Sequence, residues 1–379
     1  MRIAFIASSQ IPSLTANSIR VMKVCQAFAE LGHEIRLWVP RTPAAFDWPA
    51  ARVHYGLRRE FPIDFVEGAA WLRRWDVAMR SAQAASRWKP DLHYVWPYQA
   101  AAYLSLAAQP TAIEVHDRPS GLAGPLLFRG FLAGRGAMRV LPITESLRAA
   151  LEKEYGPRIR PPFARVLPSG VDLAAYDGMP SPRTARAKLG LPEMFTATYT
   201  GHLYSGRGLD LMAALAARNP GVSFIWAGGK PDDVDAWRER LQLEGIRNVH
   251  LMGFVPNSDL PMLHAASDVL LMPYAKRIAV SSGGDTAAYA SPMKTFEYMA
   301  AGRAILSSDL PVFGEVLNAG NAVLLPPEDV DAWDRALQAM QADDGRREAL
   351  GAQARREAAA YDWKARAGKA IEGLEPGSP

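Results

Sequence analysis

Two successive series of short apolar runs and amphipathic helical segments constrain the fold of this chain most. The first run, residues 2–7, is followed by a helical pattern over residues 18–31 and by a second run at residues 34–39. Such β–α–β units use right-handed crossovers and stack into a parallel sheet. The alternation resumes after residue 195, so the sequence predicts two doubly wound α/β domains that face each other across a cleft.

Proline content and the strand pattern suggest where these domains divide. Further strands are expected at residues 91–96, 112–115, 137–143, 196–200, 222–227, 249–254, 269–273, 304–307 and 322–325. Residues 179–192 contain three prolines and several basic residues, which is typical of an interdomain connection. We therefore assign an N-terminal domain to residues 1–170, a C-terminal domain to residues 171–360, and a C-terminal helix or tail to residues 361–379.

The composition excludes several classes of protein. The single cysteine, Cys25, rules out an intramolecular disulfide framework and a cysteine-based zinc site. No apolar run approaches the ~20 residues that span a bilayer, and the first run is too short for a secretory signal. We expect a cytoplasmic, enzyme-like protein.

Charge is distributed unevenly along the chain. Residues 1–170 carry 22 Lys plus Arg against 13 Asp plus Glu, whereas residues 171–379 carry 21 against 26. The basic half suits an anionic partner, such as a membrane surface or a phosphorylated substrate, although an accidental imbalance of solvated side chains explains it equally well. Residues 71–88 form a basic amphipathic pattern, which fits either peripheral membrane contact or a helix packed on the core. The basic residues are dispersed, so nucleic-acid binding is not expected.

Ligands of open α/β sheets bind beyond the carboxyl ends of the strands, so the loops there are the first candidates for a site. The loop at residues 8–18 has no glycine, which excludes a dinucleotide fingerprint there, and the chain contains no P-loop motif. This loop offers Asn17 and Ser18 at a helix N-terminus, where a cap is the simpler interpretation of Ser18. His116 directly follows another predicted strand and can donate or accept a hydrogen bond near neutral pH.

A glycine-containing loop at residues 199–210 has the composition of a diphosphate site. Gly201, Gly206 and Gly208 let the backbone approach a ligand closely. Arg207 can pair with phosphate oxygens bidentately. A flexible loop with a solvated arginine is the alternative interpretation.

A second such segment covers residues 281–303. Ser291 and the proline after it are expected to be the N-cap and first residue of a helix. The first turn would present free amides to an anion, with Lys294 close by. Glu297, one turn further, can accept both hydroxyls of a ribose, because an ionised carboxylate has two acceptor oxygens. A plain solvent-facing carboxylate is the alternative.

Taken together, these segments resemble the retaining, nucleotide-sugar-dependent glycosyltransferases of the GT-B fold, in the family-four group. The resemblance runs from residue 1 to about residue 363. Four stretches carry it: SPMKTFEYMAAGRAIL (291–306), LPSGVDLAAYD (167–177), YTGHLYSGRGLDLM (199–212) and MGFVPNSDLPMLHAASDVLLMP (252–273). It implies an acceptor-side N-terminal domain, a nucleotide-sugar-binding C-terminal domain, and a C-terminal segment that packs back on the first domain.

The resemblance also implies roles for individual residues. The implied donor-binding set is Gly201, His202, Arg207, Ser291, Met293, Lys294, Thr295 and Glu297. Arg207 would bind the diphosphate, Glu297 the ribose, and the amides of the helix start the phosphates. Catalytic roles are implied for His116, Arg207 and Lys294. Asn17 and Ser18 lie in the loop that, in relatives, closes over donor and acceptor.

The chain departs from the family pattern at two positions of the donor site. His202 stands where the family has its first basic residue after the glycine, so phosphate neutralisation would rest more on Arg207 and Lys294. Tyr289 stands where the first glutamate of the family's pair would fall. Asp285, Ser291 or backbone groups would then contact the donor sugar.

The expected function is therefore transfer of a sugar from a nucleotide-sugar donor to a glycan, lipid-linked or small-molecule acceptor, with retention of anomeric configuration. We expect no metal and no other cofactor, because the sequence shows no convincing metal-ligand cluster and the resemblance implies metal independence. Two alternatives stay open. One is a nucleotide-sugar epimerase of the same architecture, and the other is a catalytically silent protein that binds a nucleotide or a partner, which the tyrosine at position 289 favours.

Overall fold

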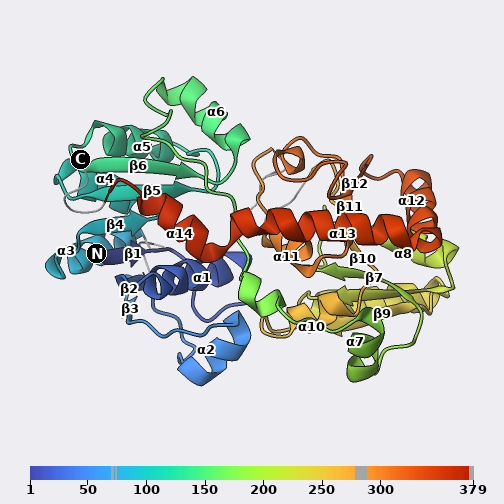
Figure 1. Cartoon of the computed structure of the whole chain (residues 1–379). Coiled ribbons are helices and arrows are strands. Elements are labelled where there is room, and N and C mark those ends of the chain that lie inside the picture. The colour runs from blue at the N-terminus through green and yellow to red at the C-terminus, as the bar shows by residue number, and fades with distance from the viewer. Residues whose placement is uncertain (70–71, 73–74, 278–287, 375–379) are drawn as a thin grey trace. The chain divides into compact units, whose positions relative to one another are not determined.

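The protein is described by a computed structural model that covers residues 1–69, 72, 75–277 and 288–374 (Figure 1). It divides into two units. Unit 1 comprises Met1–Ser169 together with the C-terminal residues from Trp363, and unit 2 comprises Gly170–Asp362. Each unit contains its own six-stranded sheet, and the paired strands of each run parallel. The prediction of two parallel α/β domains is confirmed.

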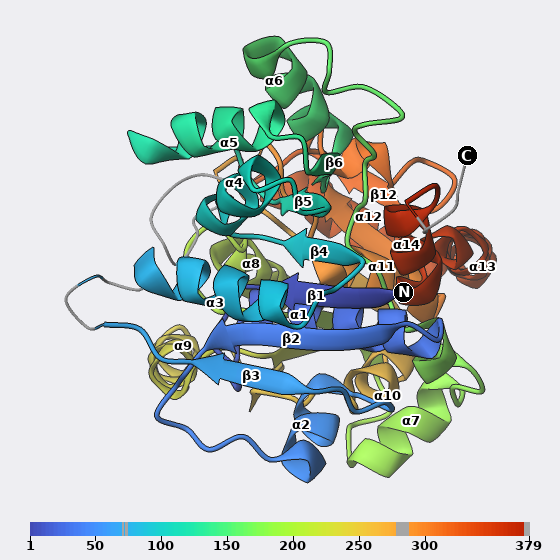
Figure 2. The ribbon, with the colours of Figure 1, turned by 90° about the vertical axis from the view of Figure 1, so that its left-hand side faces the viewer.

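The sheet of unit 1 has the order β3-β2-β1-β4-β5-β6, which Figure 2 shows from bottom to top. Its strands are β1 (Arg2–Ile6), β2 (Glu34–Pro40), β3 (Ile63–Val66), β4 (Leu92–Val95), β5 (Thr111–Val115) and β6 (Ala137–Pro142). The order reverses direction between β1 and β4, the switch point at which open α/β sheets place their ligands. Every residue of β4 and β5 is buried, because helices cover both faces of a doubly wound sheet.

Seven helices of the described chain belong to unit 1. They are α1 (Ala16–Glu30), α2 (Trp48–Tyr55), α3 (Trp75–Arg87), α4 (Tyr98–Leu106), α5 (Ala123–Ala133), α6 (Glu145–Tyr155) and α14 (Trp363–Ile371). Helix α14 packs against α1, so the end of the chain completes the first unit. In α3, the apolar residues Ala78, Ala82 and Ala85 are buried, and the helix packs on β1, β2 and β3. The alanines of the apolar stripe over residues 71–88 are therefore part of the core of unit 1, whereas Trp75, at the start of α3, is exposed.

The sheet of unit 2 has the order β12-β11-β10-β7-β8-β9. Its strands are β7 (Phe195–Thr200), β8 (Val222–Ala227), β9 (Val249–Gly253), β10 (Val269–Met272), β11 (Ala304–Ser308) and β12 (Val323–Leu325). Its helices are η2 (Leu173–Tyr176), α7 (Pro182–Leu189), α8 (Leu209–Arg218), α9 (Pro231–Leu243), α10 (Leu260–Ala265), α11 (Met293–Ala301), η3 (Phe313–Glu315), α12 (Val330–Ala342), α13 (Asp344–Ala358) and η4 (Ala359–Tyr361). The strand order reverses between β7 and β10, so the loops after these strands are the expected ligand site.

Three local predictions differ from the structure. Residues 179–192 are not an interdomain connection: they include α7, which Ser181 caps through its side chain and Gly190 ends in a left-handed conformation. Helix α1 is capped by Thr15 rather than Ser18. Helix α11 has Pro292 at its N-cap, with no side-chain cap, so Ser291 lies outside the helix.

The described helices contain none that is both long and apolar enough to cross a bilayer.

Candidate functional site

The turn after β7 brings the chain close to a lysine of another element. Gly201 has φ of 145°, and a Cβ atom built at this position would lie 2.6 Å from the Nζ atom of Lys294 on α11. An L side chain rarely adopts this backbone conformation and would also collide with the ammonium group. The backbone conformation at this position therefore favours glycine.

Arg207 and Lys294 come from separate segments and share one aromatic neighbour. The guanidinium carbon of Arg207 lies 5.0 Å from the ring centroid of Tyr204 and 4.9 Å from that of Tyr274. The Nζ atom of Lys294 lies 3.9 Å from the centroid of Tyr199 and 5.2 Å from that of Tyr274. Cations placed over aromatic faces gain electrostatic stabilisation without a counter-ion.

These two cations have no anionic partner in the described chain. The Nζ atom of Lys294 and the Nε atom of Arg207 are buried and lack a hydrogen-bond partner among the described residues. Burial lowers the pKa of Lys294 well below its usual value, and the charge of Arg207 lowers it further, against the opposing effect of Glu297. A buried ammonium beside a half-buried guanidinium is costly without a counter-charge, so an anionic ligand would be bound favourably.

His202 does not add positive charge to this part of unit 2. Its ring stacks on Tyr204 with 5.1 Å between centroids. Burial lowers the pKa of His202 to about 4, and the charges of Arg207 and Lys294 contribute to this shift. The imidazole is therefore neutral at pH 7, and the positive charge comes from Arg207 and Lys294.

Helix α11 places the remaining predicted donor-binding residues. The amides of Met293 and Lys294 lie in its first turn, where a helix leaves its N–H groups without intrahelical carbonyl partners. The side chain of Thr295 is buried and donates its hydroxyl to the Sδ atom of Met272 at 3.3 Å, so only its backbone can face a ligand. Glu297 is half-buried, and its Oε1 atom accepts a hydrogen bond of 3.3 Å from the Nδ2 atom of Asn257.

Three candidates for donor-sugar contact stand at or before the start of α11. Tyr289 and Ser291 are half-buried, in the loop that leads into the helix. Asp285 lies outside the described residues.

A buried network under this region was not anticipated from the sequence. The Oη atom of Tyr298 accepts hydrogen bonds from the amide and the hydroxyl of Thr200, at 2.8 and 3.1 Å. His264 is fully buried between Thr200 and Tyr176. The Oη atom of Tyr176 lies 3.1 Å from the Nδ1 atom of His264. The network fixes the end of β7, and hence Gly201, to α11 and α10. The histidine within an apolar stretch was the signal that could have identified it.

In unit 1, His116 lies just beyond β5 and is held by two neighbours. Its Nε2 atom lies 2.8 Å from the Oε1 atom of Glu114, and its ring meets that of Trp96 edge-on at 4.2 Å. Burial lowers the pKa of His116, so the ring is neutral at pH 7. The sequence identified His116 by its position, but it did not identify Glu114 as its partner.

The residues of the N-terminal loop behave differently from one another. Ser18 is buried. Its hydroxyl lies 2.8 Å from the backbone oxygens of both Ser13 and Thr15 and can donate a hydrogen bond to either. Ser18 therefore shapes the loop instead of presenting a free hydroxyl. Asn17 is exposed.

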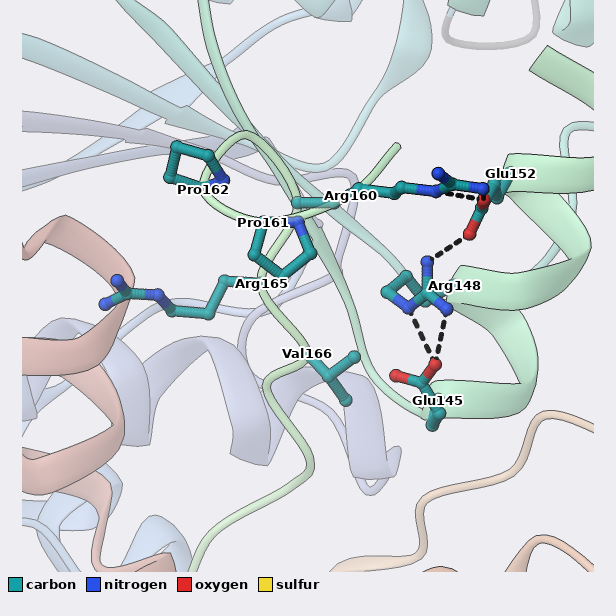
Figure 3. A pocket seen from close by; sticks show the side chains of 9 residues that line it. Glu145, Arg148, Glu152, Arg160, Pro161, Pro162, Arg165 and Val166 are labelled. Carbon is teal, nitrogen blue, oxygen red and sulfur yellow. Dashed lines mark hydrogen bonds and ion pairs between the residues drawn. The ribbon is translucent and has the colours of Figure 1, made fainter. Parts of the chain in front are cut away.

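A pocket of 630 Å³ opens elsewhere on unit 1, as Figure 3 shows. Its lining residues are Glu145, Arg148, Glu152, Arg160, Pro161, Pro162, Ala164, Arg165 and Val166. Arg148 pairs with Glu145 and with Glu152 at 2.6 Å, and Arg160 pairs with Glu152. These charges neutralise one another, and none of the predicted site residues lines the pocket, so we do not assign the donor to it.

Comparison with known proteins relates both units to one group of enzymes. Residues 18–175 match the family model described as Glycosyltransferase Family 4, and residues 196–343 match the one described as Glycosyl transferases group 1. A D-inositol 3-phosphate glycosyltransferase of Kineococcus radiotolerans is 26% identical over 252 residues, which cover 62% of this chain and 56% of that protein. A phosphatidyl-myo-inositol mannosyltransferase of Mycolicibacterium smegmatis is 29% identical over 208 residues, which cover 52% and 48%. The chain thus spans about half the length of the curated relatives it matches.

Solved structures share the fold of the whole chain. The crystal structure of Anabaena HepE in complex with UDP matches with a TM-score of 0.74 at 18% identity, over 99% of both chains. That of WaaG, a glycosyltransferase involved in lipopolysaccharide biosynthesis, matches with a TM-score of 0.68 at 17% identity, over 99% of this chain and 100% of WaaG.

Proposed function

Because the chain belongs to the GT-B glycosyltransferases of the family-four group, we propose that it transfers a sugar from a nucleotide-sugar donor to an acceptor hydroxyl. The observation that carries this proposal is the cationic pair of unit 2. Arg207, which is half-buried, and Lys294, which is buried, lie over one tyrosine ring at the carboxyl edge of the sheet, without an anion among the described residues. A diphosphate supplies the missing negative charge.

The same groups suit the chemistry of the leaving group. Departure of a nucleoside diphosphate builds negative charge on its outer phosphate, and preorganised cations and helix-start amides stabilise such charge. Arg207, Lys294 and the first turn of α11 would supply this stabilisation without a metal. The described residues contain no group of three or more His, Cys, Asp or Glu side chains placed to hold a metal ion.

We propose a uridine diphosphate sugar as the first donor to test, since HepE, of the same fold, has been crystallised with UDP and with UDP-glucose. Glu297 would accept the ribose hydroxyls, with Asn257 orienting its carboxylate through the 3.3 Å hydrogen bond. Retention of anomeric configuration is proposed from family membership. The acceptor would attack from the face that the diphosphate leaves, and the departing phosphate would take the acceptor proton.

For the acceptor, we propose a polyol or lipid-linked hydroxyl compound. The two curated relatives are named for inositol phosphate and phosphatidyl-inositol substrates. The excess of basic residues in residues 1–170 is compatible with an anionic acceptor or with contact with the cytoplasmic face of an anionic membrane. Binding to vesicles with and without an anionic lipid, at low salt, tests the membrane contact.

Nucleotide release from a panel of UDP-, GDP- and ADP-sugars tests the reaction, with and without acceptors. We expect acceptor-dependent release of the nucleotide from sugars of one of these three nucleotides. We expect the Arg207→Ala variant to fold normally and to lose most of its turnover. Tyr289 in place of the family's first glutamate favours the alternative of a silent nucleotide-binding protein. Tight binding of a nucleotide without any release would support that alternative.

A further inference from the structure

Glu114 is a fully enclosed carboxylate beside His116. It lies in β5, and its side chain is 0% exposed. Four side chains from separate parts of unit 1 surround it. Two of them meet its Oε2 atom: Tyr94 of β4 donates its hydroxyl to it, and the Nη2 atom of Arg366 of α14 lies 2.9 Å away. The other two meet its Oε1 atom: the Nε2 atom of His116 lies at 2.8 Å and the Nη1 atom of Arg20 of α1 at 3.7 Å.

This surrounding keeps Glu114 ionised. Burial alone would raise the pKa of its carboxyl, but Arg366, His116 and Arg20 together hold that pKa below its usual range. An ionised carboxylate can only accept hydrogen bonds. The hydrogen between Glu114 and His116 therefore belongs to the Nε2 atom of the imidazole.

Arg366 is itself fixed by the backbone. Its Nε atom donates to the carbonyl of Pro168 at 2.6 Å, and its Nη2 atom donates to that of Leu167 at 3.2 Å. Its exposed fraction is 3%, so the guanidinium cannot move away from Glu114 without unpacking α14. The carboxylate is consequently held at one position.

The other nitrogen of His116 is available to a ligand. The side chain of His116 is 24% exposed, and its Nδ1 atom has no hydrogen-bond partner in the part of the chain that the structure describes. The ring is kept neutral because burial and the charges of Arg20 and Arg366 outweigh the effect of Glu114 on its pKa. A neutral imidazole that carries its hydrogen on Nε2 has an acceptor lone pair on Nδ1.

We propose that Glu114 and Arg366 are positioning residues that fix His116 as the Nε2–H tautomer, so that Nδ1 accepts a hydrogen bond from a hydroxyl of the transferred sugar. The assignment of a sugar to this edge of unit 1 rests on the proposed function. The tautomer itself does not, because it follows from the contacts within unit 1. A purely structural role, in which Glu114 only anchors α14 to the sheet, is the competing explanation.

Nitrogen-15 NMR of the full chain, labelled at histidine, tests the tautomer directly. A His116→Asn variant identifies the resonances of His116. At pH 7, we expect a protonated Nε2 and an unprotonated Nδ1. A proton on Nδ1 would overturn the proposal. This result does not depend on any activity, so it stands even if the protein proves not to transfer sugar.

A double-mutant cycle then tests the positioning role in the reaction. Glu114→Gln is expected to lower kcat by about tenfold, because one hydrogen bond to the substrate would be misplaced. In a His116→Ala background, Glu114→Gln should have no further effect on kcat. Equal losses in both backgrounds would show that Glu114 acts only on the fold.

Arg139→Met is the matched control for loosening α14. Arg139 is 5% exposed and donates to the carbonyls of Ala370 and Glu372, at 3.1 and 2.8 Å. It therefore anchors the same helix through the backbone carbonyls at the end of the chain. This variant should lower the melting temperature and leave both kcat and the tautomer of His116 unchanged. If Arg139→Met changes the tautomer of His116, the positioning role is refuted.

Discussion

Arg207 and Lys294 lie over the same aromatic ring, that of Tyr274, at 4.9 and 5.2 Å from its centroid. The charge of Arg207 disfavours the charged form of Lys294, and burial of Lys294 removes the water that would screen the repulsion. No carboxylate pairs with the Lys294 ammonium among the described residues. Such an arrangement costs folding free energy and is useful only where an anion is bound.

Lys294→Met should separate folding from binding. The buried ammonium opposes folding, so we expect the variant to gain about 1 kcal/mol of unfolding free energy without ligand. It should lose most of the increase in melting temperature that UDP gives the unmodified protein. Thermal unfolding with and without UDP measures both effects. A variant that is destabilised without ligand, yet still stabilised by UDP, would contradict this role.

Lys294 should also make the stability of the ligand-free protein depend on pH. Its pKa in the folded protein lies well below the usual value of 10.5, so between these two values the unfolded chain binds more protons. The free energy of unfolding therefore rises with pH in this window. We expect urea unfolding at pH values below 10.5 to show a steeper rise with pH for the unmodified protein than for Lys294→Met. Identical slopes would show that the ammonium is not buried as described.

His264 should contribute to acid denaturation. Burial lowers its pKa to about 3 from 6.5, so the unfolded chain takes up a proton at a higher pH than the folded protein does. Stability is therefore lost as pH falls from about 6.5 toward 3. His264→Gln should be less stable at pH 7 but should show a shallower loss between pH 7 and pH 5. His250→Gln, on β9, is the control and should keep the original slope.

Much of this fold could be predicted from the sequence because buried parallel strands appear as continuous apolar runs. The runs at residues 2–7 and 196–200 correspond to β1 and β7. Helix starts were less certain where several capping residues follow one another. Thr15 and Ser18 both suit an N-cap, and only the structure shows that Thr15 accepts the amide of Ser18.

Composition was misleading at residues 179–192. The prolines and basic residues suggested a connection, although Ser181 before Pro182 and Gly190 are the start and stop signals of α7. In the candidate site, His116 was selected by its position after a strand, Arg207 by the glycines around it, and Lys294 by its place at a helix start. The pairing of Glu114 with Arg366 joins β5 to the last helix, and no local pattern encodes a contact between such distant segments.

Gly201→Ala should damage the site by straining the backbone and displacing the ammonium group of Lys294. The added Cβ atom would lie 2.6 Å from the Nζ atom of Lys294, in a backbone conformation with φ of 145°. We expect a loss of about 1–3 kcal/mol in stability and weaker UDP binding. Gly221→Ala is the matched control, since no atom lies within 4 Å of a Cβ atom at that position. If Gly201→Ala binds UDP as well as the control does, the turn after β7 does not approach the ligand.

The most direct measurement is calorimetric titration of the unmodified protein, Arg207→Ala and Arg148→Ala with UDP. Arg148 is a matched arginine of the charged pocket on unit 1, to which we assign no donor. We expect Arg207→Ala to weaken UDP binding at least about tenfold, as the loss of a charge-assisted contact implies, while Arg148→Ala binds like the unmodified protein. Equal affinity of the unmodified protein and Arg207→Ala would contradict the assignment of the diphosphate to the cationic pair of unit 2.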